Sequence, residues 1–249
     1  MSAISQSVRS ISGYGKSSLS FKYLTLDGTG TLFYLKESIG DTYLNHYRAI
    51  CDPNMQDLSI VQSINKNFGR AFKNEAAKMP NFGRNTLSSL SASAWWSNVV
   101  YHSFPESLHA KIDESMDELM TSLYNHYSSS NAWQVFDDVR PTLERLQNQG
   151  IPMGVISNFD ERIESILESL ELRQYFSFVL SSWEHGEMKP AASIFHQAAR
   201  LHGLEKSIEM LHVGDDMEKD VHGAQKAGYQ GRLIERKTKH ESLNHVLGL

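Results

Sequence analysis

The sequence contains a single cysteine, Cys51, and no run of about 18 consecutive apolar residues. One cysteine excludes an intramolecular disulfide and a thiolate metal cluster, and such sparse use of cysteine is typical of a reducing compartment. The N-terminus also lacks the uninterrupted apolar core of a secretory signal. We therefore expect a soluble intracellular protein without a zinc finger, an iron–sulfur site or a transmembrane helix.

An excess of basic residues is absent as well. The chain has 24 lysines and arginines against 29 aspartates and glutamates, which gives a net charge of −5. A basic surplus is the usual mark of proteins that bind nucleic acids or anionic membranes, so we expect neither partner. With 40% hydrophobic and 21% charged residues in 249, the composition is that of a globular protein with one large domain, or one domain carrying an insertion.

The N-terminal end is rich in serine and has no acidic residue in its first 22 positions. Because such a polar end cannot bury enough surface to fold, we expect a flexible tail over residues 1–20. Ile4, Val8 and Ile11 have helical spacing in this basic, serine-rich segment, which is also the composition of a weak mitochondrial presequence. A cytoplasmic location is the main expectation, and a mitochondrial one is the alternative.

Strand and helix patterns alternate in the C-terminal half of the chain. Short apolar runs predict strands at 23–27, 151–157, 178–182, 210–214 and 230–234. Between them, periodic segments predict helices, among them one ended by Gly150, one opened by Pro190 and one over 221–227. This alternation is typical of an α/β fold with a parallel sheet.

The segment from about 36 to 135 has no convincing strand and shows helical spacing instead, for example at Ile60, Ile64 and Phe68. We expect an all-helical insert over 36–135 between two parts of a core domain, 21–35 and 136–249. Aromatic residues in helical segments mostly belong to the core, although these could also line a substrate pocket: Trp95, Trp96, Tyr101 and Trp133.

Polar residues stand where the predicted strands end. They are Asp27 before the Gly-rich run GTGT, Ser157 and Asn158, Lys189, and Asp215 and Asp216 with Asp220 a turn later. In an open α/β sheet, ligands bind beyond the carboxyl ends of the strands, so we expect these side chains to converge. Converging carboxylates repel each other unless a hard cation lies between them, and Mg²⁺ prefers such oxygen ligands. Lysine and hydroxyls would neutralise a phosphoryl group that a carboxylate could attack.

These residues, in this order, resemble the four motifs of the haloacid dehalogenase superfamily. The first motif matches Asp27, Thr29, Gly30, Thr31 and Leu32, the second Ser157 in VISNFD, the third Lys189 in GEMKP, and the fourth Gly214, Asp215 and Asp220. The resemblance covers nearly everything after residue 22. It implies a Rossmannoid three-layer core with a parallel sheet, and an all-helical cap of the C1 type inserted between the first and second motifs.

The resemblance also implies a role for each matched residue. Asp27 would be the nucleophile, and Ser157 and Lys189 would act with it in catalysis. The phosphate group would be held by Thr31, Ser157, Asn158 and Lys189, and Mg²⁺ by Asp27, Asp215 and the backbone carbonyl of Thr29. Asp216 and Asp220 would support the site, although both lie near a helix start, where the helix dipole stabilises acidic residues in any protein.

Thr29 is a departure from the family's phosphatases, which carry an aspartate at this position to protonate the leaving group. A threonine hydroxyl cannot act as an acid or base near neutral pH, and such catalysis typically contributes about 10²–10⁴-fold. We therefore expect slow turnover, or turnover restricted to good leaving groups. The family's ion-pumping ATPases also have threonine here, but this chain has no membrane segment.

The expected function is Mg²⁺-dependent hydrolysis of a small phosphorylated molecule through an aspartyl phosphate. One alternative is a weakened homologue that binds a phosphorylated ligand or a partner without turnover. Another is a 2-haloacid dehalogenase, an enzyme that attacks with the same first aspartate. Dehalogenases need no metal, however, and their fourth motif lacks the Gly-Asp with a following aspartate that Gly214, Asp215 and Asp220 provide.

Overall fold

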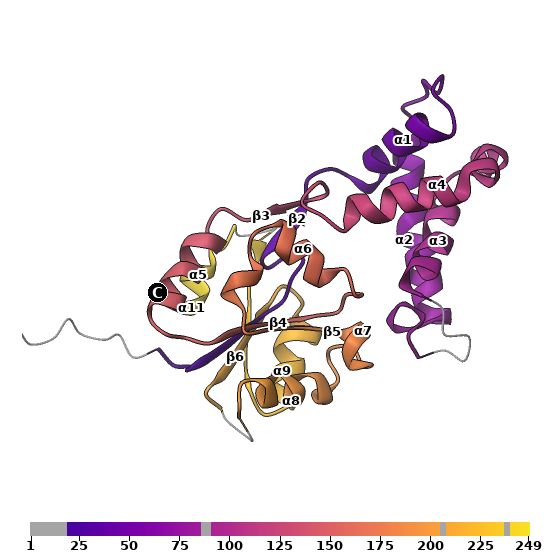
Figure 1. The fold of residues 1–249 in the computed structure, drawn as a ribbon. Coiled ribbons are helices and arrows are strands. Elements are labelled where there is room, and N and C mark those ends of the chain that lie inside the picture. Colours follow the sequence, from indigo (N-terminus) through magenta and orange to yellow (C-terminus); the bar gives the residue numbers. More distant parts are fainter. Residues whose placement is uncertain (1–18, 86–90, 205–207, 237–239) are drawn as a thin grey trace, which may run out of the picture.

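The computed structural model of the protein describes residues 19–85, 91–204, 208–236 and 240–249. Its centre is a five-stranded parallel sheet in the order β5-β4-β1-β6-β7 (Figure 1). The strands are β1 (Tyr23–Leu26), β4 (Met153–Ser157), β5 (Phe178–Ser181), β6 (Met210–Gly214) and β7 (Gln230–Leu233). The predicted α/β fold with a parallel sheet is confirmed. Most of the expected N-terminal tail lies outside the described residues, whereas Ser20 accepts hydrogen bonds from Gln230 and Arg232 of β7.

Helices cover both faces of this sheet. The helices α5 (Val139–Asn148), α6 (Ile163–Ser169) and α11 (Leu243–Leu247) pack against one face, and α8 (Ala192–Leu201) and α9 (Gly223–Lys226) pack against the other. The central strand β1 is covered on both sides, which is why Leu24, Thr25 and Leu26 are all fully buried. Burial on both faces explains the continuous apolar character of the strand sequences.

Helix α8 begins at Ala192, so Pro190 precedes the helix and does not open it as predicted. Two side-chain hydrogen bonds from Asn158 hold the backbone of Lys189 outside the helix, and a residue before proline disfavours the helical conformation. The segment predicted as one helix over 221–227 starts earlier, with a π-helical turn, η4 (Met217–His222), that runs into α9. Two further short elements of the core are η3 (Arg173–Tyr175) and α7 (Ser182–His185).

The insert forms a separate helical layer, at the upper right of Figure 1. Its helices are α1 (Ile39–Ile50), α2 (Ile60–Lys78), α3 (Ala92–Ser103) and α4 (His109–Tyr127), with the short turns η1 (Asn81–Gly83) and η2 (Glu106–Leu108). They enclose two apolar clusters of their own, around Tyr43 and around Trp95. No helix in the described part of the chain combines the length and apolarity needed to cross a bilayer.

The expectation that 36–135 contains no strand is wrong at its C-terminal end. Strand β3 (Trp133–Val135) pairs antiparallel with β2 (Phe33–Leu35), and this ladder joins the helical insert to the core. Each strand has three residues, too few to show the alternation of apolar and polar side chains that is typical of a strand. The two segments pair only because the fold of the insert brings its two ends together. The pattern of either segment alone therefore does not reveal the pairing.

The insert also contacts the core at its far end, beside α7. Asn81 Nδ2 donates to the carbonyl oxygen of Ser182 over 2.8 Å, and Arg84 Nε donates to that of Trp183 over 3.2 Å. Asn81 is buried and has a left-handed backbone conformation with φ of 52°. The insert is thus attached at the β2–β3 ladder and again at α7, and we call it the cap.

Candidate active site

A cavity of about 460 Å³ opens beyond the carboxyl ends of β1, β4 and β6. Strand β1 lies at the centre of the sheet with β4 on one side and β6 on the other, so the chain order reverses at this position. Such a reversal is where α/β proteins bind ligands. Of the residues predicted for the site, all but Thr31 line this cavity, namely Asp27, Thr29, Ser157, Asn158, Lys189, Asp215, Asp216 and Asp220.

Lys189 joins two carboxylates at the bottom of the cavity. Its Nζ lies 2.7 Å from Oδ1 of Asp27 and 2.6 Å from Oδ1 of Asp220, and it also donates to the carbonyl oxygen of Ile156. The side chains of Lys189 and Asp220 are 2% and 1% exposed, whereas that of Asp27 keeps 13%. Asp27 is therefore the carboxylate of this ion-pair network that a ligand in the cavity can reach.

The ion-pair network controls the protonation of its members. Burial alone would lower the pKa of Lys189, but the negative charges of Asp27 and Asp220 raise it above its ordinary value. Burial would raise the pKa of Asp220, but Lys189 and His212 hold it well below its ordinary value. For Asp27, burial outweighs the opposing effect of Lys189 and leaves the pKa raised. A cation beside Asp27 would therefore favour its ionised form.

His212 is a buried neighbour of this network. Its Nε2 lies 3.1 Å from Oδ1 of Asp220, and its Nδ1 lies 2.9 Å from the hydroxyl of Thr25. Burial lowers the pKa of His212, so the neutral ring is favoured. A neutral ring that donates from Nε2 and accepts at Nδ1 satisfies both neighbours, and it fixes the carboxylate that holds Lys189.

Asp215 lies over the Gly-rich turn that follows β1. A Cβ atom added at Gly30, whose φ is +81°, would come within 2.2 Å of Oδ2 of Asp215. Carboxylate oxygens of Asp27, Asp215 and Asp220 all lie within 4.8 Å of one another. Asp220 accepts from Lys189, His212 and the amide of Asp216, which fix its position. Asp27 and Asp215 offer hard carboxylate oxygens of the kind that Mg²⁺ prefers.

Two residues of the second motif line the cavity in different ways. Ser157 ends β4, is 3% exposed, and contributes to the cavity wall near Gly28. The amide of Asn158 donates from Nδ2 to the carbonyl oxygen of Lys189 and accepts at Oδ1 from the amide of Lys189. The Asn158 side chain thus positions the Lys189 loop, and its amide is already used in doing so.

Thr31 and Asp216 form hydrogen bonds outside the ion-pair network. Thr31 is fully buried, and its backbone oxygen accepts from Nη2 of Arg236. Because it does not line the cavity, this arrangement does not support a phosphate contact by the Thr31 side chain. Asp216 caps η4 by accepting from the amides of Glu218 and Lys219, which is the structural alternative that the sequence left open.

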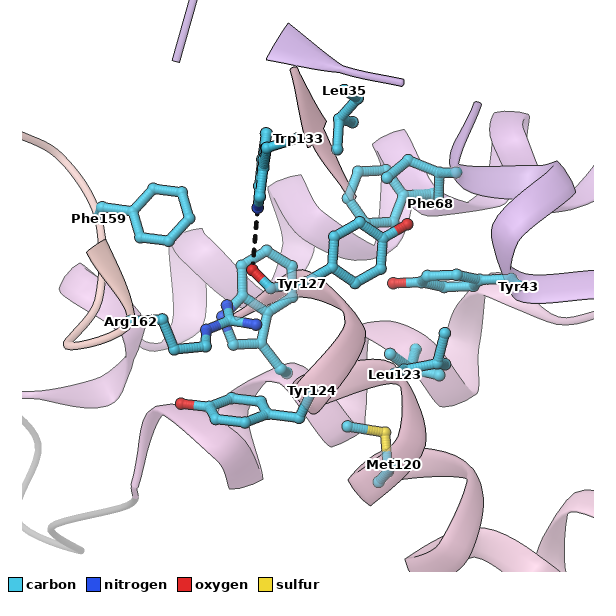
Figure 2. Close-up of a pocket in the computed structure, with 13 residues that line it drawn as sticks. Leu35, Tyr43, Phe68, Met120, Leu123, Tyr124, Tyr127, Trp133, Phe159 and Arg162 are labelled. Carbon is cyan, nitrogen blue, oxygen red and sulfur yellow. Dashed lines mark hydrogen bonds between the residues drawn. The ribbon is translucent and has the colours of Figure 1, made fainter. Parts of the chain in front are cut away.

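A second cavity, of about 180 Å³, lies between the cap and the core (Figure 2). Trp96 and Trp133 line it, whereas Trp95 is 1% exposed and belongs to the cap interior. Sequence reasoning did not identify Phe159, which lines both cavities, or Arg162, which lies at the wall of the second. Phe159 belongs to the VISNFD segment, two residues after the end of β4, and Arg162 follows that segment by two residues, so their place beside the second motif was the available signal.

Comparisons with known proteins identify the family of the chain. Residues 21–228 match the haloacid dehalogenase-like hydrolase family. The chain is similar to haloacid dehalogenase-like hydrolase domain-containing protein 3 of Bos taurus, with 31% identity over 217 residues that cover 87% of this chain and 82% of that protein.

Solved structures share the fold. A 2-haloacid dehalogenase from Pseudomonas syringae has a TM-score of 0.58 at 24% identity and covers 88% of each chain. A HAD phosphatase from Thermococcus onnurineus has a TM-score of 0.53 at 20% identity and covers 89% of this chain and 91% of its own. Together with the match over residues 21–228, these findings show that the chain belongs to the haloacid dehalogenase-like hydrolases.

Proposed function

We propose that the protein is a Mg²⁺-dependent phosphohydrolase that acts on a small phosphorylated molecule through an aspartyl phosphate. The observation that carries this proposal is the position of Asp27, which faces the cavity with Lys189 at 2.7 Å and the Asp215 carboxylate nearby. A carboxylate flanked by a fixed cation and a second carboxylate suits attack on an anionic phosphorus centre better than attack on a neutral carbon.

The reaction follows from these residues in two steps. An oxygen of Asp27 attacks phosphorus, the bond from phosphorus to the leaving oxygen breaks, and the leaving group departs with the electron pair. Lys189 and the Ser157 hydroxyl offset the negative charge on the phosphoryl oxygens. A water molecule then attacks the phosphorus of the aspartyl phosphate, which releases inorganic phosphate and restores Asp27.

The donors present fit a magnesium ion, since Asp27 and Asp215 are hard oxygen ligands that converge on the same side of the cavity. Asp27, Asp215 and the backbone carbonyl of Thr29 would hold it. The ion, when bound, supplies positive charge that screens the phosphoryl group from the surrounding carboxylates.

The test is phosphate release from acetyl phosphate and from aryl phosphates, with Mg²⁺ and with excess chelator. We expect release that requires Mg²⁺, and loss of release and of phosphoenzyme in Asp27→Asn, whose amide is nearly isosteric but a poor nucleophile. Asp117→Asn, an exposed position on α4, is the control for carboxylate removal. Chelator-insensitive release, or normal turnover in Asp27→Asn free of deamidation, would refute the proposal.

Thr29 favours one alternative, a protein that binds a phosphorylated ligand and turns it over little or not at all. Thr29 is exposed at the cavity and offers no carboxyl group to activate water. Tight, specific binding of a phosphorylated ligand without phosphate release would support this alternative. Release of halide from 2-haloacids without metal would instead support a dehalogenase.

A further inference from the structure

The second cavity is built almost entirely from apolar side chains. Leu35 and Trp133 of the β2–β3 ladder, Ile39 of α1, Leu123 of α4 and Phe159 contribute to its wall (Figure 2). At about 180 Å³, it is slightly larger than the cavities of about 150 Å³ that bind benzene in a protein interior. Its size and lining therefore suit one aromatic ring or a comparable apolar group.

Arg162 lies at this cavity but adds no net charge to it. Its Nε donates to Oδ1 of Asp160 over 2.8 Å, and its Nη2 donates to Oδ2 over 2.6 Å. Both side chains are buried, and Trp96 Nε1 donates a further hydrogen bond to Oδ2 of Asp160. The guanidinium group also stacks on Tyr124, with 4.2 Å from its carbon to the ring centre. Because Asp160 neutralises Arg162, the cavity offers no net positive charge to an anionic group on the substrate other than the phosphoryl group.

The cavity and the phosphoryl site are neighbours, because Phe159 lines both. Phe159 follows Asn158 in the loop after β4, and its ring lies 6.1 Å from that of Trp133. In a phosphate ester whose phosphorus lies beside Asp27, the organic group on the ester oxygen would thus lie next to Phe159 and could enter the apolar cavity.

We propose that the apolar cavity between cap and core binds the leaving group of the substrate, and that the substrate is the phosphate monoester of a small uncharged aromatic alcohol. This inference rests on the proposed phosphohydrolase function. Thr29 supports it independently, because a site without a general acid needs a leaving group that departs unprotonated. Phenols meet that need much better than the hydroxyls of sugars, and an uncharged ring fits the cavity better than a sugar or a nucleotide does.

The first experiment compares two aryl phosphates whose phenols are about equally acidic. Phenyl phosphate is uncharged on its ring, and 3-carboxyphenyl phosphate carries a carboxylate. We expect kcat/KM to be at least about tenfold higher for phenyl phosphate, because the cavity offers the carboxylate no partner. Equal values for the two substrates would overturn the inference.

The second experiment fills the cavity. Ile39 and Ile60 are half-buried first residues of α1 and α2, and both pack against the same cap cluster, but only Ile39 lines the cavity. In Ile39→Trp, the ratio of kcat/KM for phenyl phosphate to that for acetyl phosphate should fall by about tenfold or more. In Ile60→Trp the ratio should stay unchanged. An unchanged ratio in Ile39→Trp, or the same fall in both variants, would contradict the proposal.

Binding of benzylphosphonate and methylphosphonate by calorimetry, in the presence of Mg²⁺, separates this inference from the proposed function. If no phosphate ester is hydrolysed, the proposed function fails. The cavity is then still supported by tighter binding of benzylphosphonate that Ile39→Trp weakens about tenfold. Equal affinities of the wild-type protein for the two phosphonates would overturn the cavity's role whether or not turnover occurs.

Discussion

Lys189 and Asp220 form a salt bridge of 2.6 Å in which both side chains are almost completely buried. Asp220 lies in η4, which follows β6, and Lys189 precedes α8, so the pair joins two segments on the same face of the sheet. The pair holds the ammonium group against Asp27, and His212 holds Asp220. The position of the ammonium group beside Asp27 thus depends on Asp220 and His212, whose side chains are almost completely buried.

Removal of the buried ammonium group should be strongly destabilising. In Lys189→Met the carboxylate of Asp220 stays buried without its cation, a change that typically costs about 3–5 kcal/mol of unfolding free energy. Lys219→Met is the matched control, because Lys219 pairs with Asp216 at positions 51% and 36% exposed and should cost less than about 1 kcal/mol. Urea unfolding measures both, and equal losses would contradict the structural role of Lys189.

The close approach of Gly30 to Asp215 predicts a defect in metal binding. In Gly30→Ala the new methyl group must displace the Asp215 carboxylate, so the Mg²⁺ concentration for half-maximal activity should rise about 10- to 100-fold. Gly150→Ala has a similar positive φ of 73° with open space around it, so it carries the same backbone strain without the contact. If the two variants need the same Mg²⁺ concentration, Asp215 does not hold the ion.

A carboxyl group at position 29 should restore the missing acid–base catalyst. In Thr29→Asp, kcat/KM for alkyl phosphates should rise by a factor within about 10²–10⁴, and it should rise less for aryl phosphates, which leave without a proton. Measurements of kcat/KM and of steady-state phosphoenzyme across leaving groups of different acidity test this. No gain with any leaving group would favour the ligand-binding alternative.

The stability of the protein should fall in mild acid, in part through His202. This ring lies between Tyr23 and Phe178, with ring-centre distances of 5.3 and 4.8 Å, and burial lowers its pKa from the ordinary 6.5. Below pH 6.5 the unfolded chain therefore binds more protons than the folded one, and the unfolding free energy decreases as the pH falls.

His202→Gln removes this titration while it keeps a polar side chain. Urea unfolding at pH 7.5 and at pH 5.5 should show a smaller loss of stability in the variant than in the wild-type protein. His240→Gln, an exposed position, is the control and should leave the loss unchanged. An identical loss in His202→Gln and the wild-type protein would show that burial does not suppress protonation of His202.

The alternation of strands and helices, and the identity of the residues at the strand ends, could be predicted from the sequence alone. These are local properties: an apolar run such as 153–157 is a buried strand wherever it is placed, and Ser157 must then stand at its carboxyl end. Because parallel strands present their carboxyl ends at one edge, the convergence of Asp27, Lys189 and Asp215 also follows from their order in the chain.

Other features could not be predicted from local patterns, because they depend on contacts between segments far apart in the sequence. Trp133 pairs with Leu35 only because the fold of the whole cap brings its two ends together. Lys189 and His212 come from other segments of the chain, and together they hold the carboxylate of Asp220. The apolar cavity arises from the packing of the cap against Phe159, and no local pattern encodes the space that remains when two surfaces meet.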